Sequence, residues 1–382
     1  MAFLKDENIY DVIVVGVGSM GSSACYHLAN AGLKVLGLEQ FGITHERGSH
    51  SGQSRFVRMA YFEHPDYVPL LQRAYQNWED IEALSGEYLF RKSGIVYFGT
   101  SDSIQISGVK ESASIYDLPI EKLGKDEVKN RFHQFDIPDD YEALLEANAG
   151  FVSPEKTIKT YVKYATASGA KILTKTKLRS WESHSGIIRC KTSKGTFSAK
   201  KIVFTAGGWT QRLLPKLQSK LQVTQQSLLW YRPDDISDFK EQHFMCWSIT
   251  DPDYDGMFYG FPIFDGEDPT MKLAYHSRGI EKIADEKNDL VSQEELAPLE
   301  FFFDKYMPEL KGEMVKAKTC LYNYSEDEDF IIDSLPGYDD NVIVACGFSG
   351  HGFKFVPVIG EIIKDLVTKG KSELPIEFLK MR

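Results

Sequence analysis

Residues 10–21 read YDVIVVGVGSMG, and this stretch decides the fold. Its apolar, β-branched run over 12–15 predicts a buried parallel strand that ends in a glycine-rich turn. A helix is predicted over 22–29 and a second strand over 34–39. Together they form a βαβ unit of about 30 residues, which predicts an α/β lobe with a parallel sheet.

The turn has the spacing Gly-x-Gly-x-x-Gly, and an acid ends the next strand about 20 residues later, a pattern typical of dinucleotide sites. Its first glycine permits the tight turn, the second lets a pyrophosphate approach the helix N-terminus, and the third permits close helix–strand contact. The acid can accept hydrogen bonds from ribose hydroxyls. The alternative is a turn that binds nothing. The residues expected to contact the cofactor in this unit are Gly16, Gly18, Ser19, Met20, Gly21, Glu39 and Gln40.

The α/β pattern is interrupted twice along the 382 residues, a length that favours two lobes over one core. We expect a discontinuous cofactor lobe made of 1–85, 150–215 and 320–382, and a substrate lobe made of 86–149 and 216–319. The motif alone does not separate NAD from FAD, but a second glycine-rich turn at 347–352 and the long insertions favour the extended FAD. The predicted fold class is α/β (α+β overall), with a Rossmann-like lobe interleaved with a mixed or antiparallel sheet.

Composition excludes several classes of partner. Lys and Arg number 44 against 55 Asp and Glu, so the formal net charge is −11. An acidic surface disfavours nucleic acids and anionic membranes, because both are polyanions. No apolar run approaches the roughly 20 residues that span a bilayer, and the N-terminus lacks signal-peptide regions. The five cysteines include no CxxC pair, which disfavours disulfides and metal sites. We expect a cytoplasmic protein.

Several further motifs carry a family resemblance. They are Gly16–Gly21, Gly48–Arg58, Tyr259–Pro262, Lys272–His276, Thr319–Tyr322, Asp329–Asp333 and Gly347–Lys354. With them the chain resembles the monomeric sarcosine oxidase family, which includes N-methyltryptophan oxidase and peroxisomal sarcosine/pipecolate oxidase. The resemblance implies a monomer that oxidises the C–N bond of a secondary-amine amino acid to an imine with FAD, while O2 becomes hydrogen peroxide.

The same resemblance implies that FAD is joined covalently through its 8α-methyl carbon to Cys320, which composition alone presents as a core thiol. A cationic neighbourhood favours the reactive thiolate, and Lys316 and Lys318 are the candidates near it in sequence. The further cofactor contacts that it implies are Gly48, Ser49, Ser54, Arg55, Cys320, Gly347, Phe348, Gly350, His351, Gly352, Phe353 and Lys354.

The substrate carboxylate has two implied anchors, Arg58 and Lys354. A guanidinium offers a bidentate fork and an ammonium offers a point charge. The alternative for Arg58 is an arginine in a polar surface loop. The alternative for Lys354 is a helix-start lysine, which is physically awkward because a cation at a helix N-terminus is disfavoured without an anion.

The catalytic candidates implied by the resemblance lie on three motifs. Lys272 matches a lysine assigned to oxygen activation, and Arg55 is expected beside the flavin with Lys272 or an acid as its partner. Tyr259, His276 and Tyr322 are expected to line the substrate cavity. The alternatives are a solvated strand face for Lys272 and a satisfied core histidine for His276.

One departure from the family pattern lies beside the expected cavity. Bacterial members read His-His-Gly-Asp where this chain reads His50-Ser51-Gly52-Gln53, so Ser51 replaces a histidine. Sarcosine is therefore not fixed as the substrate, and neither are stereochemistry and electron acceptor. Two alternatives stay open: a deglycating (fructosyl-type) amine oxidase or a flavin dehydrogenase with another acceptor, and a non-catalytic flavin-binding protein.

Overall fold

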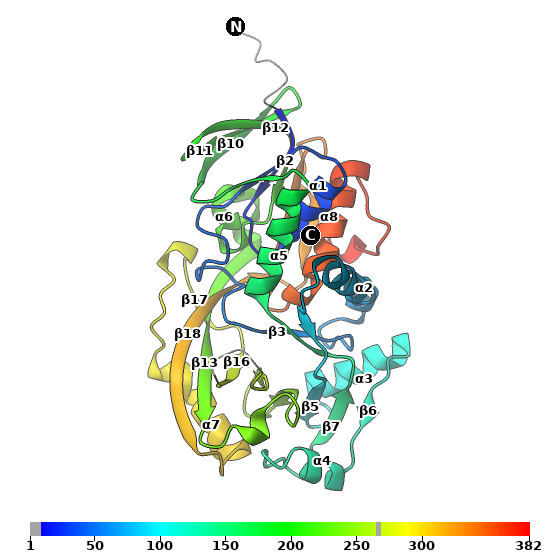
Figure 1. The fold of residues 1–382 in the computed structure, drawn as a ribbon, viewed down its shortest axis with the longest axis vertical. Helices are drawn as coiled ribbons and strands as arrows, with labels where there is room; N and C mark the ends of the chain where they lie inside the picture. The colour runs from blue at the N-terminus through cyan, green and yellow to red at the C-terminus, as the bar shows by residue number, and fades with distance from the viewer. Residues whose placement is uncertain (1–8, 265–268) are drawn as a thin grey trace.

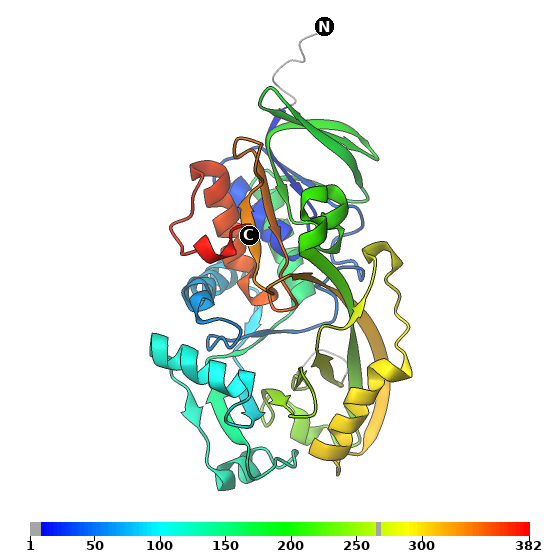
Figure 2. The same cartoon turned by 180° about the vertical axis from the view of Figure 1, so that it is seen from behind.

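A computed structural model describes residues 9–264 and 269–382. The N-terminal residues 1–8, part of the stretch in which a signal peptide was sought, lie outside the described residues. Figure 1 shows the cofactor-side sheet with helices α1, α5 and α8 above a second sheet, and Figure 2 shows the same two-lobed arrangement from behind. The α/β fold class predicted from the sequence is confirmed.

The upper lobe is built around an eight-stranded sheet in the order β10-β11-β12-β1-β2-β9, with β20 on β12 and β19 on β20. Its central pairs are parallel, as the βαβ unit predicts, and the strand cores are buried on both faces. The strands are β1 (Ile9–Val15), β2 (Val35–Leu38), β9 (Lys171–Leu173), β10 (Leu178–His184), β11 (Ile187–Thr192), β12 (Gly195–Phe204), β19 (Ile331–Ser334) and β20 (Val342–Cys346).

Helix α1 is clamped between two other helices on this sheet. It packs against α8 and α5, and α2 covers the far side of α8. A Cβ at Gly360 of α8 would lie 2.1 Å from Ser23 Oγ of α1, so the close crossing requires glycine there. The bounds are α1 (Ser19–Asn30), α2 (Val68–Ser85), α5 (Pro154–Ala167), α6 (Thr210–Leu213) and α8 (Val356–Lys369).

The lower lobe contains a nine-stranded sheet in the order β17-β13-β16-β15-β14-β5-β7-β6, with β18 on the other edge of β13. Strand β5 pairs in parallel with β14, so the two predicted insertions share one mixed sheet. The strands are β5 (Ile95–Gly99), β6 (Glu121–Lys122), β7 (Glu142–Glu146), β13 (Leu221–Pro233), β14 (Cys246–Thr250), β15 (Met257–Gly260), β16 (Met271–His276), β17 (Ile280–Glu281) and β18 (Gly312–Ser325).

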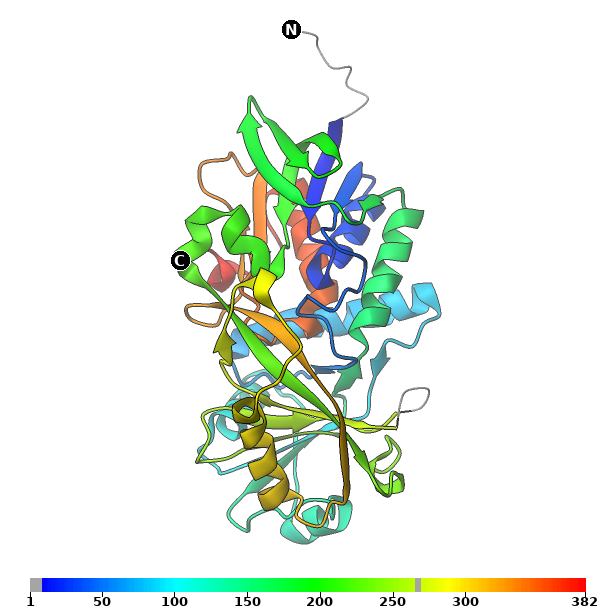
Figure 3. The same ribbon diagram turned by 90° about the vertical axis from the view of Figure 1, so that its left-hand side faces the viewer.

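The two lobes are joined by a long antiparallel ribbon. Strands β13 and β18 pair from Leu221–Ser325 to Pro233–Gly312, and Figure 3 shows them running from the upper lobe into the lower one. The expected lobe boundary at 320 therefore falls inside β18. Helices α3 (Ile104–Tyr116), α4 (Lys125–Arg131) and α7 (Gln293–Tyr306) cover the lower sheet, and β3 (Arg55–Val57), β8 (Gly150–Val152) and β4 (Phe90–Arg91) form a small third sheet.

Candidate active site

A cleft of about 1210 Å³ opens beside the glycine-rich turn after β1. Gly16 has φ +90°, and a Cβ on it would lie 2.5 Å from the Thr205 carbonyl oxygen. A Cβ on Gly21 would lie 1.8 Å from the Gly16 oxygen, so both positions require glycine. Gly18 is the N-cap of α1 and its helix start has no side-chain cap, which leaves backbone N–H groups for an anionic ligand.

The Glu39 carboxylate, expected to contact a ribose, also binds two backbone N–H groups beside this cleft. Its Oε2 accepts a hydrogen bond from Val17 N at 3.0 Å, and its Oε1 accepts one from Phe41 N at 2.8 Å. Burial raises the pKa of Glu39, and the backbone N–H bonds oppose that rise. The carboxylate thus pins the middle of the glycine turn to the end of β2 and still lines the cleft.

Two buried polar atoms in the cleft wall have no hydrogen-bond partner among the described residues: Nε2 of His50 and Nδ2 of Asn323. Unpaired buried polar atoms are costly, so such atoms on residues that line a cleft are a feature that fits a polar ligand there. Together with the glycine turn, they make the site fit a dinucleotide such as FAD. The cleft residues absent from the sequence predictions include His45, Arg47, His50, Thr205, Trp209 and Asn323. Apart from the loop motif around His50, no pattern signals them.

Arg55 organises the loop that precedes it. Its guanidinium donates to the carbonyl oxygens of Ser49, Ser51, Gly52 and Ser54, at 2.6 to 3.3 Å. The predicted partnership with an acid is not present as a direct contact. Instead, residues 49–54 wrap around the buried cation, and Glu155 of α5 accepts a bond from Gly52 N at 3.2 Å.

Lys272 on β16 shares an acceptor with Arg55. Its Nζ donates to the Ser54 carbonyl oxygen at 2.7 Å, the oxygen that Arg55 also contacts. The ammonium lies 4.7 Å from the ring centroid of Phe261, and the residue is 2% exposed. Burial, together with the neighbouring Arg55, lowers the pKa of Lys272 well below its usual value. The solvated-face alternative for Lys272 is therefore wrong.

Cys320 lies on β18 and is fully buried. Burial raises the pKa of its thiol, and the cations that oppose this rise are Arg55, Lys272 and Lys287. The two lysines near it in sequence have other contacts: Lys316 covers the Trp230 ring, and Lys318 pairs with Glu46. The cationic neighbourhood comes from other strands and loops.

A second cavity, of about 480 Å³, adjoins the cleft. Its aromatic wall is formed by Tyr259, Phe261 and Tyr322 with the neutral His276, whose pKa burial lowers to about 4. A Cβ on Gly350 would lie 2.5 Å from the Tyr322 ring, so the turn can only close as glycine. The residues that line both spaces are Arg55, Tyr322, Gly350 and Phe353.

Arg58 is buried at the side of the second cavity and already holds a carboxylate. Its Nη2 donates to both oxygens of Glu63, at 2.5 and 2.6 Å, and its Nη1 donates to the Ala60 carbonyl at 3.0 Å. Burial opposes ionisation of Glu63, but Arg58, together with the nearby His351 and Lys354, outweighs burial and lowers the pKa of Glu63 to about 2. The arginine is 2% exposed, so the surface-loop alternative is wrong.

Lys354, in the turn Phe353–Phe355, lines the same cavity without a carboxylate in contact among the described residues. Its Nζ donates to the His351 carbonyl oxygen at 2.7 Å. Burial and the nearby Arg58 lower the pKa of Lys354 to about 7. Lys354, expected both as a carboxylate anchor and as a cofactor contact, and His351, expected as a cofactor contact, line the second cavity and not the cofactor cleft.

His351 is fixed by two neighbours. Its Nε2 lies 3.1 Å from the Glu328 carbonyl oxygen, which can only accept, so Nε2 carries the proton. Nδ1 then accepts from the Tyr61 hydroxyl. Burial lowers the pKa of His351 to about 3, which keeps the ring neutral.

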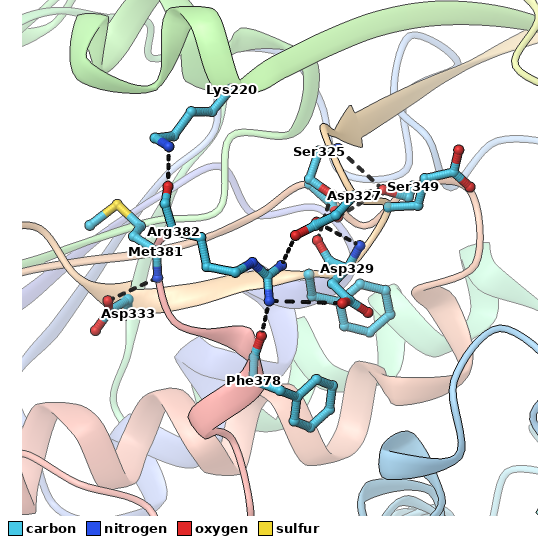
Figure 4. Close-up of polar contacts among 12 residues, drawn as sticks. Lys220, Ser325, Asp327, Asp329, Asp333, Ser349, Phe378, Met381 and Arg382 are labelled. Carbon is cyan, nitrogen blue, oxygen red and sulfur yellow. Dashed lines mark hydrogen bonds and ion pairs between the residues drawn. The ribbon is translucent and has the colours of Figure 1, made fainter.

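The turn at 347–352 is braced from behind by the C-terminal segment (Figure 4). Arg382 pairs with Asp327 at 2.6 Å and lies 3.8 Å from Asp329. Ser325 Oγ donates to the Asp329 carbonyl at 2.5 Å, and Ser325 N donates to Ser349 Oγ at 3.2 Å. A continuous set of bonds thus ties the end of β18 to the turn that separates the two cavities.

The predicted site residues divide into three groups. Those that line the cofactor cleft are Gly16, Gly18, Ser19, Met20, Glu39, Gln40, Gly48, Ser49, Arg55, Tyr322, Phe348, Gly350, Gly352 and Phe353. Those that line the second cavity are Arg55, Arg58, Tyr259, His276, Tyr322, Gly350, His351, Phe353 and Lys354. Those that lie behind these walls are Gly21, Ser54, Lys272, Cys320 and Gly347. Among the described residues there is no metal-binding cluster and no helix that could cross a membrane.

Comparisons with known proteins agree with this geometry. Residues 11–366 match the family described as FAD dependent oxidoreductase. Monomeric sarcosine oxidase of Streptomyces avermitilis is 38% identical over 368 residues, covering 96% of each chain. N-methyl-L-tryptophan oxidase of Yersinia pestis is 37% identical over 355 residues, covering 92% of this chain and 93% of that one. The open form of NikD, an amino acid oxidase essential for nikkomycin biosynthesis, shares the fold with a TM-score of 0.85 at 22% identity, covering 98% of each chain.

Proposed function

The chain belongs to the FAD-dependent oxidoreductases, together with monomeric sarcosine oxidase and N-methyl-L-tryptophan oxidase, and we propose that it oxidises secondary-amine amino acids. The candidate substrates are sarcosine, other N-methyl amino acids and pipecolate. One observation carries this proposal. Two buried cations, Arg58 and Lys354, line a small aromatic cavity that shares a wall with the cofactor cleft. A carboxylate held there places its amine against that shared wall.

FAD, when bound, supplies a two-electron acceptor for the hydrogen lost from the carbon next to nitrogen. The substrate C–N bond becomes an imine, which water hydrolyses, and O2 takes up the two electrons with two protons as hydrogen peroxide. The protein contributes orientation and charge. Lys354 Nζ and the Arg58 guanidinium hold the carboxylate, while Tyr259 and Tyr322 line the cavity that receives the amine.

The amine must be neutral to lose hydride, and the cavity favours that form. His276 and His351 are both uncharged near neutral pH, because burial lowers the pKa of each below 5. The charged side chains among the described residues that line the cavity are Arg55, Arg58, Lys354 and Glu63, and the Glu63 carboxylate is engaged by Arg58. A substrate ammonium therefore meets cations, which disfavour it.

Lys272 is proposed to act on the oxygen side of the reaction. Its Nζ is held beside Arg55 by the Ser54 carbonyl. Negative charge that develops nearby as O2 is reduced favours the protonated lysine, and the ammonium then stabilises that charge.

Cys320 is proposed as the covalent tether through the flavin 8α-methyl carbon. Its Sγ is buried beside the cations Arg55 and Lys272, which favour the thiolate. Forming the thioether removes one hydrogen from the thiol and one from the methyl group, and O2 is the oxidant. Acid-precipitated protein should keep its yellow colour. A colourless pellet with free FAD in the supernatant would rule out the tether.

The decisive test of substrate class is a screen of peroxide release. Purified holoenzyme is offered sarcosine, N-methyl amino acids, pipecolate, proline and glycated amines, with primary amino acids as the matched control. We expect peroxide from the N-methyl or cyclic amines. The small size of the second cavity, about 480 Å³ against about 1210 Å³ for the cofactor cleft, favours these over glycated amines. Flavin bleaching without peroxide would instead indicate a dehydrogenase, and no bleaching with any amine would indicate a binding protein.

We also propose a monomeric, cytoplasmic protein. The five cysteines are buried and unpaired, which suits a reducing compartment. The relative of Streptomyces avermitilis is named monomeric. Light scattering coupled to size-exclusion chromatography should give a mass near 43.3 kDa, and a mass of twice that would contradict the monomer.

A further inference from the structure

We propose that Asn323 is a hydrogen-bond donor to the flavin half of the cofactor and thereby favours its reduced state. This inference rests on membership of the FAD-dependent family, but not on the identity of the substrate. Asn323 lies on β18, is 6% exposed, and lines the cofactor cleft without lining the substrate cavity. No motif in the sequence marks it.

The orientation of the Asn323 amide is fixed by its neighbour. Gly347 N donates to Asn323 Oδ1 at 3.1 Å, and a backbone N–H can only donate, so the atom that receives it must be the oxygen. The amide nitrogen is therefore the atom left without a partner among the described residues. Burying an unpaired NH₂ group is unfavourable, and a ligand acceptor in the cleft would remove that penalty.

The side chain is held rigidly at this position. The backbone carbonyl oxygen of Asn323 accepts from Ser349 N at 3.0 Å, and Asn323 is paired with Val223 of β13. Gly347 has φ +63°, so the turn that supplies the bond to Oδ1 has a conformation that favours glycine. A donor held this firmly does not need to be ordered by the ligand, which is the arrangement expected of an electrostatic contact.

The turn at 347–353 places Asn323 near the end of the cleft that meets the substrate cavity. Asn323 accepts hydrogen bonds from Gly347 N and Ser349 N of this turn, and Gly350 and Phe353 of the same turn border both the cleft and the substrate cavity. The ribose-facing end, at Gly18 and Glu39, is formed by the first βαβ unit instead. Reduction adds negative charge to the flavin, so an N–H donor there stabilises the reduced form more than the oxidised form.

The test compares the flavin midpoint potential of the holoenzyme in three variants. Asn323→Asp keeps the size and the acceptor for Gly347 N but removes the donor. Asn323→Thr keeps an oxygen that can accept from Gly347 N, on a β-branched side chain that suits a strand. The shorter side chain has no NH₂ group to donate to the cofactor. Ser325→Ala is the matched control, because it loosens the same turn from behind without touching the cleft.

Reduction by dithionite with a reference dye, and FAD content after gel filtration, provide readouts that need no substrate. We expect Asn323→Asp to weaken binding of reduced relative to oxidised flavin about tenfold, which lowers the midpoint potential by about 30 mV for a two-electron couple. Asn323→Thr should shift it in the same direction, and Ser325→Ala should not. A folded Asn323→Asp protein that loses FAD, while Ser325→Ala retains it, also supports the contact.

Wild-type potential, spectrum and FAD content in both Asn323 variants would overturn the proposal. So would a holoenzyme crystal structure in which a water molecule, and not the cofactor, accepts from Nδ2. Neither of these results would change the outcome of the peroxide screen for substrates. Likewise, a screen that finds no substrate would not change the measured midpoint potentials of the Asn323 variants. The two proposals can therefore fail separately.

Discussion

The molecule buries two pairs of cations, and the pairs differ in what neutralises them. Arg55 and Lys272 meet on the Ser54 carbonyl and contact backbone oxygens, and no carboxylate of the described residues is in direct contact with them. Arg58 and Lys354 lie in the substrate cavity, where Arg58 holds the Glu63 carboxylate. Backbone oxygens cannot be exchanged for a ligand, but a side-chain carboxylate can. The first pair is thus built as a fixed group of hydrogen-bond donors, and the second as an exchangeable anion site.

The largest effect should follow from removing a cation of the fixed pair. Lys272→Met should slow reoxidation of reduced enzyme by O2 by about 10²- to 10³-fold, because a preorganised charge is lost from the reacting centre. Anaerobic reduction of the flavin by substrate should change far less. Stopped-flow absorbance separates the two steps.

Lys316→Met is the control. It removes a lysine from the strand that carries Cys320, where Lys316 covers the Trp230 ring and not the thiol. It should leave both steps unchanged. Equal slowing of reduction and reoxidation in Lys272→Met would mean that Lys272 does not act on the oxygen step alone. The Arg55–Lys272 pair would then not differ in role from the Arg58–Lys354 pair.

The exchangeable pair should show its effect in KM. Lys354→Met should raise KM for carboxylate substrates by about 10- to 100-fold, the loss expected for a charge-assisted hydrogen bond. Arg58→Ala should also raise KM, but less, because the wild-type guanidinium must first release Glu63. Steady-state kinetics with peroxide detection measures both. Unchanged KM in Arg58→Ala would remove that arginine from the anchor.

The sequence predicted the elements that follow local rules. The βαβ unit, the glycine turn and the lobe pattern depend on periodicity and on glycines that no other residue can replace, such as Gly16. The family motifs supplied the residues that meet at the shared wall, including Tyr322 and Gly350.

Long-range pairings could not be predicted from the sequence. Whether Lys316 and Lys318 lie beside the Cys320 thiol could not be decided from the sequence, because nearness along a strand does not decide which cations from other elements face the thiol. The Arg58–Glu63 pair was also missed, since two charges five residues apart in a loop have no periodic signal. His50 and Asn323 are distinguished from other cleft residues only by side-chain atoms left unpaired in the fold.

The pKa of Lys354 gives the exchangeable pair a pH signature. Burial and Arg58 lower this pKa to about 7, so the free enzyme loses the ammonium as pH rises through about 7. Affinity for a carboxylate should be full below that pH and fall by up to about tenfold per pH unit above it. A carboxylic acid without an amine, titrated by its effect on flavin absorbance, avoids the amine's own ionisation. Lys354→Arg should abolish the decline, and a decline that persists in this variant would assign it to another group.

The smallest effect should come from the carboxylate that occupies Arg58. Glu63→Gln keeps the size of the side chain but removes the charge with which a substrate carboxylate competes. KM should therefore fall by about two- to fivefold, as expected for weakening an ion pair at a partly exposed carboxylate. Glu361→Gln disrupts the comparable Arg73–Glu361 pair outside the cavity and should leave KM unchanged. A KM that rises in Glu63→Gln would mean that Glu63 holds Arg58 in its binding position. The Arg58–Lys354 pair would then be as fixed as the Arg55–Lys272 pair, which is held by the Ser54 carbonyl.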